Sequence, residues 1–341
     1  MGKFVFRRVL QAIPTFFGIT AIAFIIMVSA PGDPIALITF NPTRDAVSIA
    51  RMERSLGLDQ PPIIQYVYWL VGNDWVMIDV DGDGAGETPG IRHGLLRGDL
   101  GQSIRFKQPV LKLILERIPA TLQLALVSLV FGYGIGIGLG VLAAVFHKTW
   151  IDWLIRVISV IGNAIPPFWL GLVLIIIFSV QLGVLPMGGM RDIASRGGFN
   201  LAETFRHMLL PVFVFSLNTV AFVSRFVRTE ILEVLAQDYV RTAYAKGLTN
   251  RTVWLHHAAK NALIPVATYV GVSVGTLLSG SVIIEQVFDW PGMGRLVVNA
   301  VFNRDYPLVM GSVVVGAIMF IIGILFSDFL YALLDPRIRL K

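Results

Sequence analysis

The sequence has no cysteine and few charged residues. Without a thiol among its 341 residues, the chain can form neither a disulfide bond nor a thiolate metal site, and it gives no redox clue to its compartment. Only 15% of the residues are charged, whereas about 25% is usual in soluble domains. Hydrophobic residues make up 55%, and the mean hydropathy is +0.72. These values predict an integral membrane protein.

The chain also lacks the motifs of an energy source or a catalytic centre. It contains no G-x-x-x-x-G-K-[ST] loop for nucleotide phosphates, no H-E-x-x-H zinc motif and no serine elbow. A membrane enzyme is therefore not expected, and no cofactor is expected in this chain. The histidines are scattered, and we expect them at the surface or at an interface. They are His93, His147, His207, His256 and His257.

Ionisable residues are scarce in the middle of the apolar runs. We expect those near the runs to lie toward helix ends, where a charge reaches polar surroundings cheaply. They are Arg156, Arg225, Arg228, Glu285 and Asp328. An ion-coupled secondary transporter would need buried ionisable groups and inverted repeats, so it stays as the alternative interpretation only.

What the chain has instead is apolar runs of membrane-spanning length. A helix needs about 20 apolar residues to cross a bilayer core of ~30 Å. Six runs reach this length, near residues 9–30, 120–145, 153–180, 208–229, 263–284 and 308–334. The predicted fold is all-α with six transmembrane helices. Pro166-Pro167 lies near the middle of the third run and predicts a kink there.

An even number of spans places both termini on one side of the membrane. Most basic residues of the short loops lie on that side, so the positive-inside rule predicts that both termini are cytoplasmic. Residues 1–30 could also be a secretory signal. Their apolar run is longer than the usual 7–15 residues and five more spans follow, which favours a retained helix.

Residues 31–118 form the one large segment outside the membrane, after the first helix. Residues 46–56 predict a helix, and residues 109–118 predict a short amphipathic helix lying at the outer interface before the second span. In that second span, Gly132, Gly136 and Gly140 share one helix face, where another backbone can approach closely. Ordinary helix packing is the favoured interpretation, and an interface that slides during transport is the alternative.

The loop at 230–262 is basic and helical in character. Tyr239 to Lys246 predicts a short helix, and Gly247 suits the left-handed residue that often follows a helix end. Thr249 or Asn250 can cap the next helix. The loop is either a docking surface for a soluble partner or a solvated basic loop, and its composition alone does not separate the two.

An ordered series of short motifs runs along nearly the whole chain. They are Pro14-Thr15-Phe16-Phe17-Gly18-Ile19-Thr20, Pro31-Gly32-Asp33-Pro34, Leu56-Gly57-Leu58-Asp59, Gly98-Asp99-Leu100-Gly101, the segment 238–248, Asn261-Ala262-Leu263-Ile264-Pro265, Trp290-Pro291-Gly292-Met293-Gly294-Arg295, Arg304-Asp305-Tyr306-Pro307 and Asp335-Pro336-Arg337-Ile338-Arg339. With them the chain resembles a permease subunit of ABC importers of the dipeptide, oligopeptide and nickel class.

The resemblance implies a type I importer permease fold in the bacterial inner membrane, with an enlarged periplasmic region. It divides the chain into a first helix (1–30), a periplasmic region (31–118), a transmembrane domain (119–335, with the coupling loop at 230–262) and a tail (336–341). The implied partners are a second homologous permease, two ATPase subunits that bind ATP and Mg²⁺, and a periplasmic solute-binding protein. The implied cargo is a di- or oligopeptide, or else a nickel chelate, glutathione or an opine-like solute.

The resemblance also implies a coupling helix that sits on the ATPase subunit. Its residues here are Tyr239, Arg241, Thr242, Ala243, Tyr244, Ala245, Lys246 and Gly247. The general importer motif E-A-A-x3-G-x9-I-x-L-P is matched imperfectly. Arg241-Thr242-Ala243 stands for its first three residues, His257 for its isoleucine and Ala259-Lys260 for its Leu-Pro.

One acidic segment departs from the family pattern. Asp79, Asp81 and Asp83 occupy positions 1, 3 and 5 of a calcium-type loop, and Glu87 occupies position 9. Position 12 is Gly90, where a bidentate Glu would be expected. A calcium site and an acidic surface hairpin both fit, and the hairpin is favoured.

Overall fold

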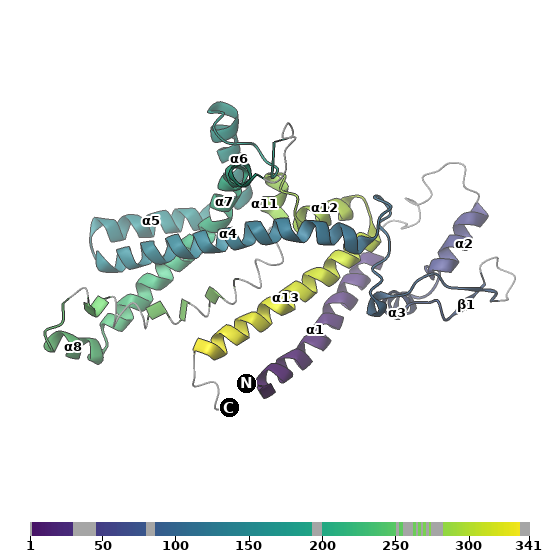
Figure 1. Cartoon of the computed structure of the whole chain (residues 1–341), viewed down its shortest axis with the longest axis horizontal. Coiled ribbons are helices and arrows are strands. Elements are labelled where there is room, and N and C mark those ends of the chain that lie inside the picture. The colour runs from purple at the N-terminus through teal and green to yellow at the C-terminus, as the bar shows by residue number, and fades with distance from the viewer. Residues whose placement is uncertain are drawn as a thin grey trace. The chain divides into compact units, whose positions relative to one another are not determined.

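A computed structural model describes residues 2–29, 46–79, 86–192, 200–249, 252–254 and 282–334, with residues 262–263, 265–266, 269–270 and 273 between them. The chain forms two compact units (Figure 1). The first comprises Met1–Val9, Pro119–Arg295 and Met319–Lys341, and the second comprises Leu10–Ile118 and Leu296–Ile318.

Helices make up most of the described chain. In chain order they are α1 (Gly2–Ser29), α2 (Ala46–Leu56), α3 (Pro62–Val71), the 3-10 turn η1 (Leu95–Arg97), α4 (Val110–Val145), α5 (Trp150–Ala164), α6 (Pro167–Leu174), the π-helix η2 (Ile175–Gln181), α7 (Leu201–Leu235), α8 (Asp238–Ala245), α11 (Val282–Val287), α12 (Met293–Phe302) and α13 (Tyr306–Leu334). The predicted helix at 46–56 is confirmed as α2.

Four described helices are long and apolar enough to cross a membrane, namely α1, α4, α7 and α13. A fifth candidate is the pair formed by α5 and the stretch Pro167–Gln181, which are bent by 100° relative to each other. The kink predicted at Pro166-Pro167 is confirmed. Two consecutive prolines remove two backbone donors and disfavour helical geometry before them, so the helix stops at Ala164 and restarts at Pro167. The run near 263–284 lies largely outside the described residues, so the count of six spans stays a prediction.

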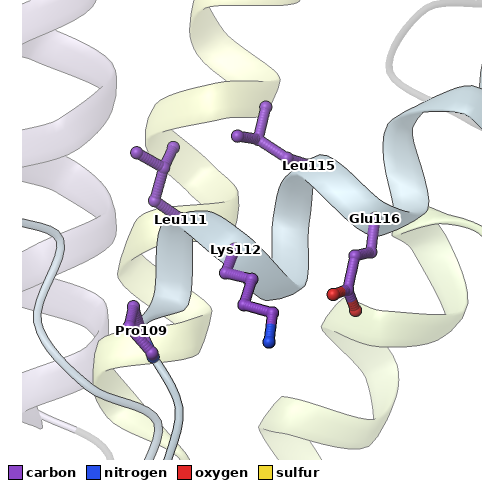
Figure 2. Close-up of a pocket in the computed structure, with 5 residues that line it drawn as sticks. All are labelled: Pro109, Leu111, Lys112, Leu115 and Glu116. Carbon is purple, nitrogen blue, oxygen red and sulfur yellow. The ribbon is translucent and has the colours of Figure 1, made fainter.

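The expected separate helix at 109–118 is not present. Residues 110–145 form one continuous helix, α4, which contains Pro119 and has 36 residues, or about 54 Å of length. Val110 and Ile114 are fully buried. The amphipathic pattern is confirmed only in part, because Leu113 is buried as well, whereas Leu111 and Leu115 are exposed beside the charged residues. An open hollow of about 450 Å³ is lined by Pro109, Leu111, Lys112, Leu115 and Glu116 (Figure 2).

The glycine face of α4 packs closely against α7. A Cβ atom added at Gly132 would lie 2.8 Å from Cβ of Thr219, and one at Gly136 would lie 2.8 Å from Cβ of Val223. At Gly140 the same atom would lie 2.7 Å from the Ser224 carbonyl oxygen. The close approach predicted from the spacing is therefore confirmed.

In the second unit, Asp305 holds the segment before α4 at the start of α13. Its carboxylate accepts hydrogen bonds from the hydroxyl of Ser103 and from the backbone N–H groups of Ile104 (3.1 Å) and Arg105 (3.2 Å). It also accepts the N–H of Leu308 at 3.4 Å, in the first turn of α13. Asp305 is 1% exposed, so these donors replace the water that it loses.

The acidic segment lies between two short strands. β1 (Met77–Ile78) pairs with β2 (Thr88–Pro89) in antiparallel register. Asp81 and Asp83 lie outside the described residues. The calcium site with Asp79 and Glu87 therefore stays a prediction.

Candidate functional site

The segment between α7 and α8 folds because one face of α8 can be buried. Val240 and Ala243 lie three residues apart on α8, and both are buried in a small cluster with Val253. Val234 and Leu235, in the last turn of α7, pack against the same cluster. Asp238 lies in the first turn of α8, where its negative charge favours the helix dipole. One side of α8 is thus buried against other residues of this chain.

The other side of α8 is open to the surroundings. Tyr239 and Tyr244 are 42% and 41% exposed. The polar and small side chains on this side are exposed as well: Arg241, Thr242, Ala245 and Lys246. Arg241 makes an ion pair of 3.3 Å with Asp238, but both side chains are well exposed and such pairs contribute only ~0–1 kcal/mol. The exposed side therefore combines two aromatic rings with positive charge.

Helix α8 ends at a left-handed glycine. Gly247 has φ +79°, and its N–H donates to the carbonyl of Tyr244 at 2.9 Å. The N–H of Leu248 donates to the carbonyl of Ala243 at 3.4 Å, which completes a Schellman-type end. Thr249 then accepts the N–H of Thr252 at 3.4 Å, so of the two residues expected to cap the next segment Thr249 is the described one. The predicted short helix and its glycine end are both present.

The structure brings all eight predicted coupling residues together on α8 and its C-terminal turn. His256, His257 and residues 255–261 lie outside the described residues, so the second half of the importer motif has no structural description here. The basic surface of α8 is therefore the candidate functional site.

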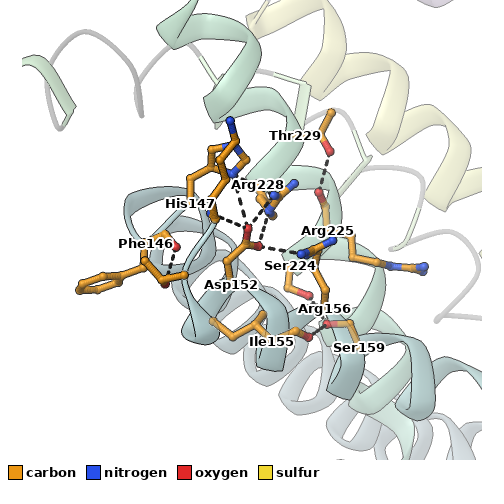
Figure 3. A network of polar contacts seen from close by, with 12 residues as sticks. Phe146, His147, Asp152, Ile155, Arg156, Ser159, Ser224, Arg225, Arg228 and Thr229 are labelled. Atoms are coloured by element: carbon orange, nitrogen blue, oxygen red, sulfur yellow. Dashed lines mark hydrogen bonds and ion pairs between the residues drawn. The ribbon is translucent and has the colours of Figure 1, made fainter.

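A buried ion cluster that the sequence did not reveal lies at the same end of α7 (Figure 3). The Asp152 side chain is 1% exposed and accepts two hydrogen bonds from Arg228, at 2.6 Å from Nε and 2.8 Å from a terminal nitrogen. Arg156 Nε lies 3.2 Å and the Lys148 N–H lies 3.1 Å from the same carboxylate. The cluster therefore joins the start of α5 to α7. Arg156 and Arg228 were expected only to lie near helix ends, and their shared partner was missed.

Glu285 lies toward the end of the short helix α11, as expected, but the expectation that its charge reaches polar surroundings there is wrong. The side chain is fully buried and accepts the hydroxyl of Thr121 at 2.8 Å and the N–H of Arg295 at 3.0 Å. A Cβ atom on Gly292 would lie 2.4 Å from the Glu285 carboxyl carbon, so only glycine lets the backbone pass this close. The motif Trp290-Pro291-Gly292-Met293-Gly294-Arg295 thus wraps around one buried carboxyl group, which hydrogen bonds make tolerable.

His207 also differs from the expectation of a surface or interfacial residue. It is 5% exposed, and one nitrogen of the imidazole faces Asp192 at 3.4 Å. Glu203 lies within the same group of side chains. No sequence motif marks this group, because Asp192 precedes α7 and the other two residues lie within it.

Two family models match this chain. Residues 136–340 match "Binding-protein-dependent transport system inner membrane component", and residues 1–125 match the N-terminal model of the same family. The chain belongs to this family.

Relatives match over the full length. The oligopeptide transport system permease protein AppB of Bacillus subtilis is 40% identical, with 99% of this chain and 100% of the relative covered. The di/tripeptide transport system permease protein DppB of Pseudomonas aeruginosa is 37% identical, with 99% of each chain covered. The glutathione transport system permease protein GsiC of Escherichia coli is 36% identical, with 100% of each covered.

Among solved structures, the fold resembles the MetNI methionine ABC transporter in its inward-facing form. The TM-score is 0.52 at 19% identity, and the match covers 66% of this chain and 97% of the other. The likeness establishes the type I importer permease fold. The protein is thus a membrane component of a binding-protein-dependent transport system.

Proposed function

We propose that the chain is the substrate-translocating permease subunit of an ATP-driven importer for di- and oligopeptides. Two of the three relatives above are named for peptide transport, and glutathione, the cargo in the name of the third, is itself a short peptide. Nickel chelates and opine-like solutes are the alternative cargoes for the same role. In this proposal the solute passes from a periplasmic binding protein to the cytoplasm.

The energy is supplied by partner subunits. The chain has no phosphate-binding loop, so two ATPase subunits bind ATP and Mg²⁺, and a second homologous permease completes the membrane pathway. The basic loops, the termini and α8 then lie on the cytoplasmic side of the inner membrane. The periplasmic region at 31–118 faces the binding protein.

The observation that carries the proposal is the two-sided character of α8. One side is fixed by Val240 and Ala243, while the other presents two tyrosines and positive charge. Aromatic residues that insert into a partner's cleft supply most of the binding energy at such surfaces, whereas exposed charges supply little. We therefore assign α8 as the coupling helix that docks on an ATPase subunit.

Motion of α8 would reach the membrane helices through α7. The buried cluster with Val234 and Leu235 attaches α8 to the last turn of α7, and the bonds between Arg228 and Asp152 attach α7 to α5. Closure of the ATPases would thus displace a connected set of helices and switch access from one side of the membrane to the other.

Substitutions at Gly247 test this assignment. A β-branched residue is strained at φ +79°, by ~1–3 kcal/mol, whereas Asn adopts the left-handed region more readily. Because nothing lies within 4 Å of the added Cβ, the effect comes from the backbone alone. We expect Gly247→Val to lower peptide uptake in proteoliposomes holding the complete transporter while ATP hydrolysis continues, and Gly247→Asn to retain most uptake.

A second variant separates docking from backbone strain. Ala245→Arg places a long side chain on the exposed side of α8 without touching the buried cluster, and we expect the ATPase subunits to co-purify less well. If Gly247→Val and Ala245→Arg both left uptake and ATPase co-purification normal, α8 would not be the coupling helix. Uptake by the chain alone, driven by an ion gradient, would favour a secondary transporter instead.

A further inference from the structure

Three potential metal ligands converge near the start of α7. Glu203 and His207 lie four residues apart on α7 and therefore on the same helix face. Asp192 approaches them from the loop that follows η2. One ligand atom from each of the three residues lies within 4.8 Å of the other two. They line a pocket of about 490 Å³, to which Asn200 and Arg206 also contribute.

The orientation of His207 is fixed by backbone carbonyl groups. Its Nδ1 lies 3.0 Å from the carbonyl oxygen of Gly188 and 3.1 Å from that of Gly189. A carbonyl oxygen can only accept, so Nδ1 carries a proton and donates it. In the neutral ring, Nε2 then presents a lone pair toward the carboxylate of Asp192, 3.4 Å away. Two acceptors that face each other are stabilised by a cation between them, which is either a metal ion or a proton on Nε2.

The carbonyl groups that hold His207 are themselves anchored. The N–H of Gly189 donates to the carbonyl of Phe288 at 2.8 Å. A Cβ atom on Gly188 would lie 2.4 Å from the same oxygen, so the loop packs there backbone to backbone. A histidine that donates its second nitrogen to a fixed carbonyl group is the usual arrangement around a bound metal ion.

The carboxylates are also held in place. Asn200 caps α7 by accepting the N–H of Ala202 at 3.1 Å and that of Glu203 at 3.4 Å, which positions the first turn. One Glu203 carboxylate oxygen accepts the N–H of Asp192 at 2.6 Å and so ties the loop to the helix. Among the described residues of the pocket, Arg206 donates to the carbonyl of Val184 at 3.1 Å.

From this geometry we propose that Asp192, Glu203 and His207 form a binding site for a divalent transition-metal ion of the Zn²⁺ type. One imidazole nitrogen and two carboxylate oxygens suit such an ion, whose ligand bonds of ~2.0–2.2 Å place neighbouring ligand atoms ~3.3 Å apart. The spacing between His207 and Asp192 already has this value. The Asp192 side chain is 63% exposed and is therefore able to turn toward the ion.

With three protein ligands, the ion keeps at least one position for water or for a carboxylate from another molecule. The bound ion fixes the loop at 183–192 to the start of α7. This proposal rests on the local geometry and not on the identity of the transported solute.

Cobalt binding tests the site directly, because Co²⁺ replaces Zn²⁺ and absorbs visible light when it is bound by protein ligands. The complete transporter is stripped of metal with a chelator and titrated with Co²⁺, and Zn²⁺ is then added as a competitor. We expect one equivalent of Co²⁺ per chain and its displacement by Zn²⁺. Asp192→Asn removes one charged ligand at an exposed position and should weaken binding at least tenfold. His207→Gln should abolish it.

Two further variants separate a metal site from a structural ion pair. Gly188→Ala should displace the carbonyl group that accepts the Nδ1 proton of His207, while the three ligand residues stay unchanged. We therefore expect it to weaken metal binding by about 10–100-fold. His93→Gln is the matched control, because His93 also lies 3.3 Å from a carboxylate, that of Asp74. It should leave binding unchanged. Absence of the cobalt spectrum, or equal affinity in the Asp192→Asn variant and the parent, would show an ion pair between His207 and Asp192 only and would overturn the proposal.

Discussion

The two ends of α7 differ in the groups that contact their carboxylates. At the C-terminal end, the single carboxylate of Asp152 meets Arg228, Arg156 and a backbone N–H. At the N-terminal end, the two carboxylates of Asp192 and Glu203 meet the imidazole of His207. The first cluster satisfies its charge from within the chain and holds helices together. The second brings three potential metal ligands within reach of one ion.

Removing the charge of Asp152 should have the largest effect. Asp152→Asn leaves the guanidinium of Arg228, whose side chain is 17% exposed, without its negatively charged partner. Loss of one member of a buried ion pair costs about 3–5 kcal/mol. We expect a clear fall in the melting temperature of the detergent-solubilised protein, together with weaker coupling between ATP hydrolysis and uptake.

The matched control is Asp238→Asn on α8. Its ion pair with Arg241 has the same chemistry, but the two side chains are 95% and 75% exposed. Such pairs contribute ~0–1 kcal/mol, so this variant should melt close to the parent. Equal melting temperatures for both variants would mean that the Asp152 cluster does not hold α5 to α7.

Between its two ends, the packing of α7 should be sensitive to the size of the α4 residues that face it and not to charge. Gly136→Ala places a Cβ atom 2.8 Å from Cβ of Val223, so α4 and α7 must move apart, at a cost of about 1–3 kcal/mol. At Gly138, on the same helix, nothing lies within 4 Å of the added atom. Because Ala favours helix over Gly by about 1 kcal/mol, Gly138→Ala should leave the melting temperature equal or higher.

Melting-temperature shifts of opposite sign in Gly136→Ala and Gly138→Ala would therefore identify the packed face of α4. Equal shifts would contradict the close approach of α4 to α7. The same pair of variants also tests the sliding alternative. An interface that slides during transport predicts that Gly136→Ala lowers uptake more than its loss of stability explains.

Patterns that depend on neighbouring residues were predictable from the sequence. The helical period placed Gly132, Gly136 and Gly140 on one face, and the left-handed preference of glycine identified the end of α8 at Gly247. Both features follow from local backbone geometry. The position of the break at Pro166-Pro167 was predictable for the same reason, although its size was not, because a 100° bend depends on how each half packs.

Contacts between distant residues were not predictable. Asp152 and Arg228 are 76 positions apart, and Thr121 and Glu285 are 164 positions apart. A single sequence gives no signal for such pairs, so the burial of Glu285 and of His207 was not predicted. The apolar residues at 109–118 divide between a buried and an exposed face, and their pattern could not show that Pro119 would be accommodated inside one long helix.

The smallest effect is expected for a surface cluster in which, as at Asp152, a carboxylate is paired with arginine. Asp74, in the second unit, accepts two hydrogen bonds from Arg97 at 2.6 and 2.7 Å, and one nitrogen of His93 lies 3.3 Å away. The bonds from Arg97 lower the pKa of Asp74 from 3.8 to about 2. Because the folded state holds the proton less tightly than the unfolded state, this contribution to stability is complete above pH 4 and is lost as the pH falls toward 2.

Comparing the melting temperatures of the parent and the Asp74→Asn variant separates the contribution of Asp74 from those of other carboxylates that titrate in the same pH range. We expect the melting temperature of the parent to be slightly higher than that of the variant from neutral pH down to about pH 4. This gap in melting temperature should close between about pH 4 and pH 2. The gap should be smaller than that for Asp152→Asn, because the Arg97 side chain is 47% exposed and water screens the pair. A gap that vanished already at pH 5 would mean that Arg97 does not hold Asp74 ionised.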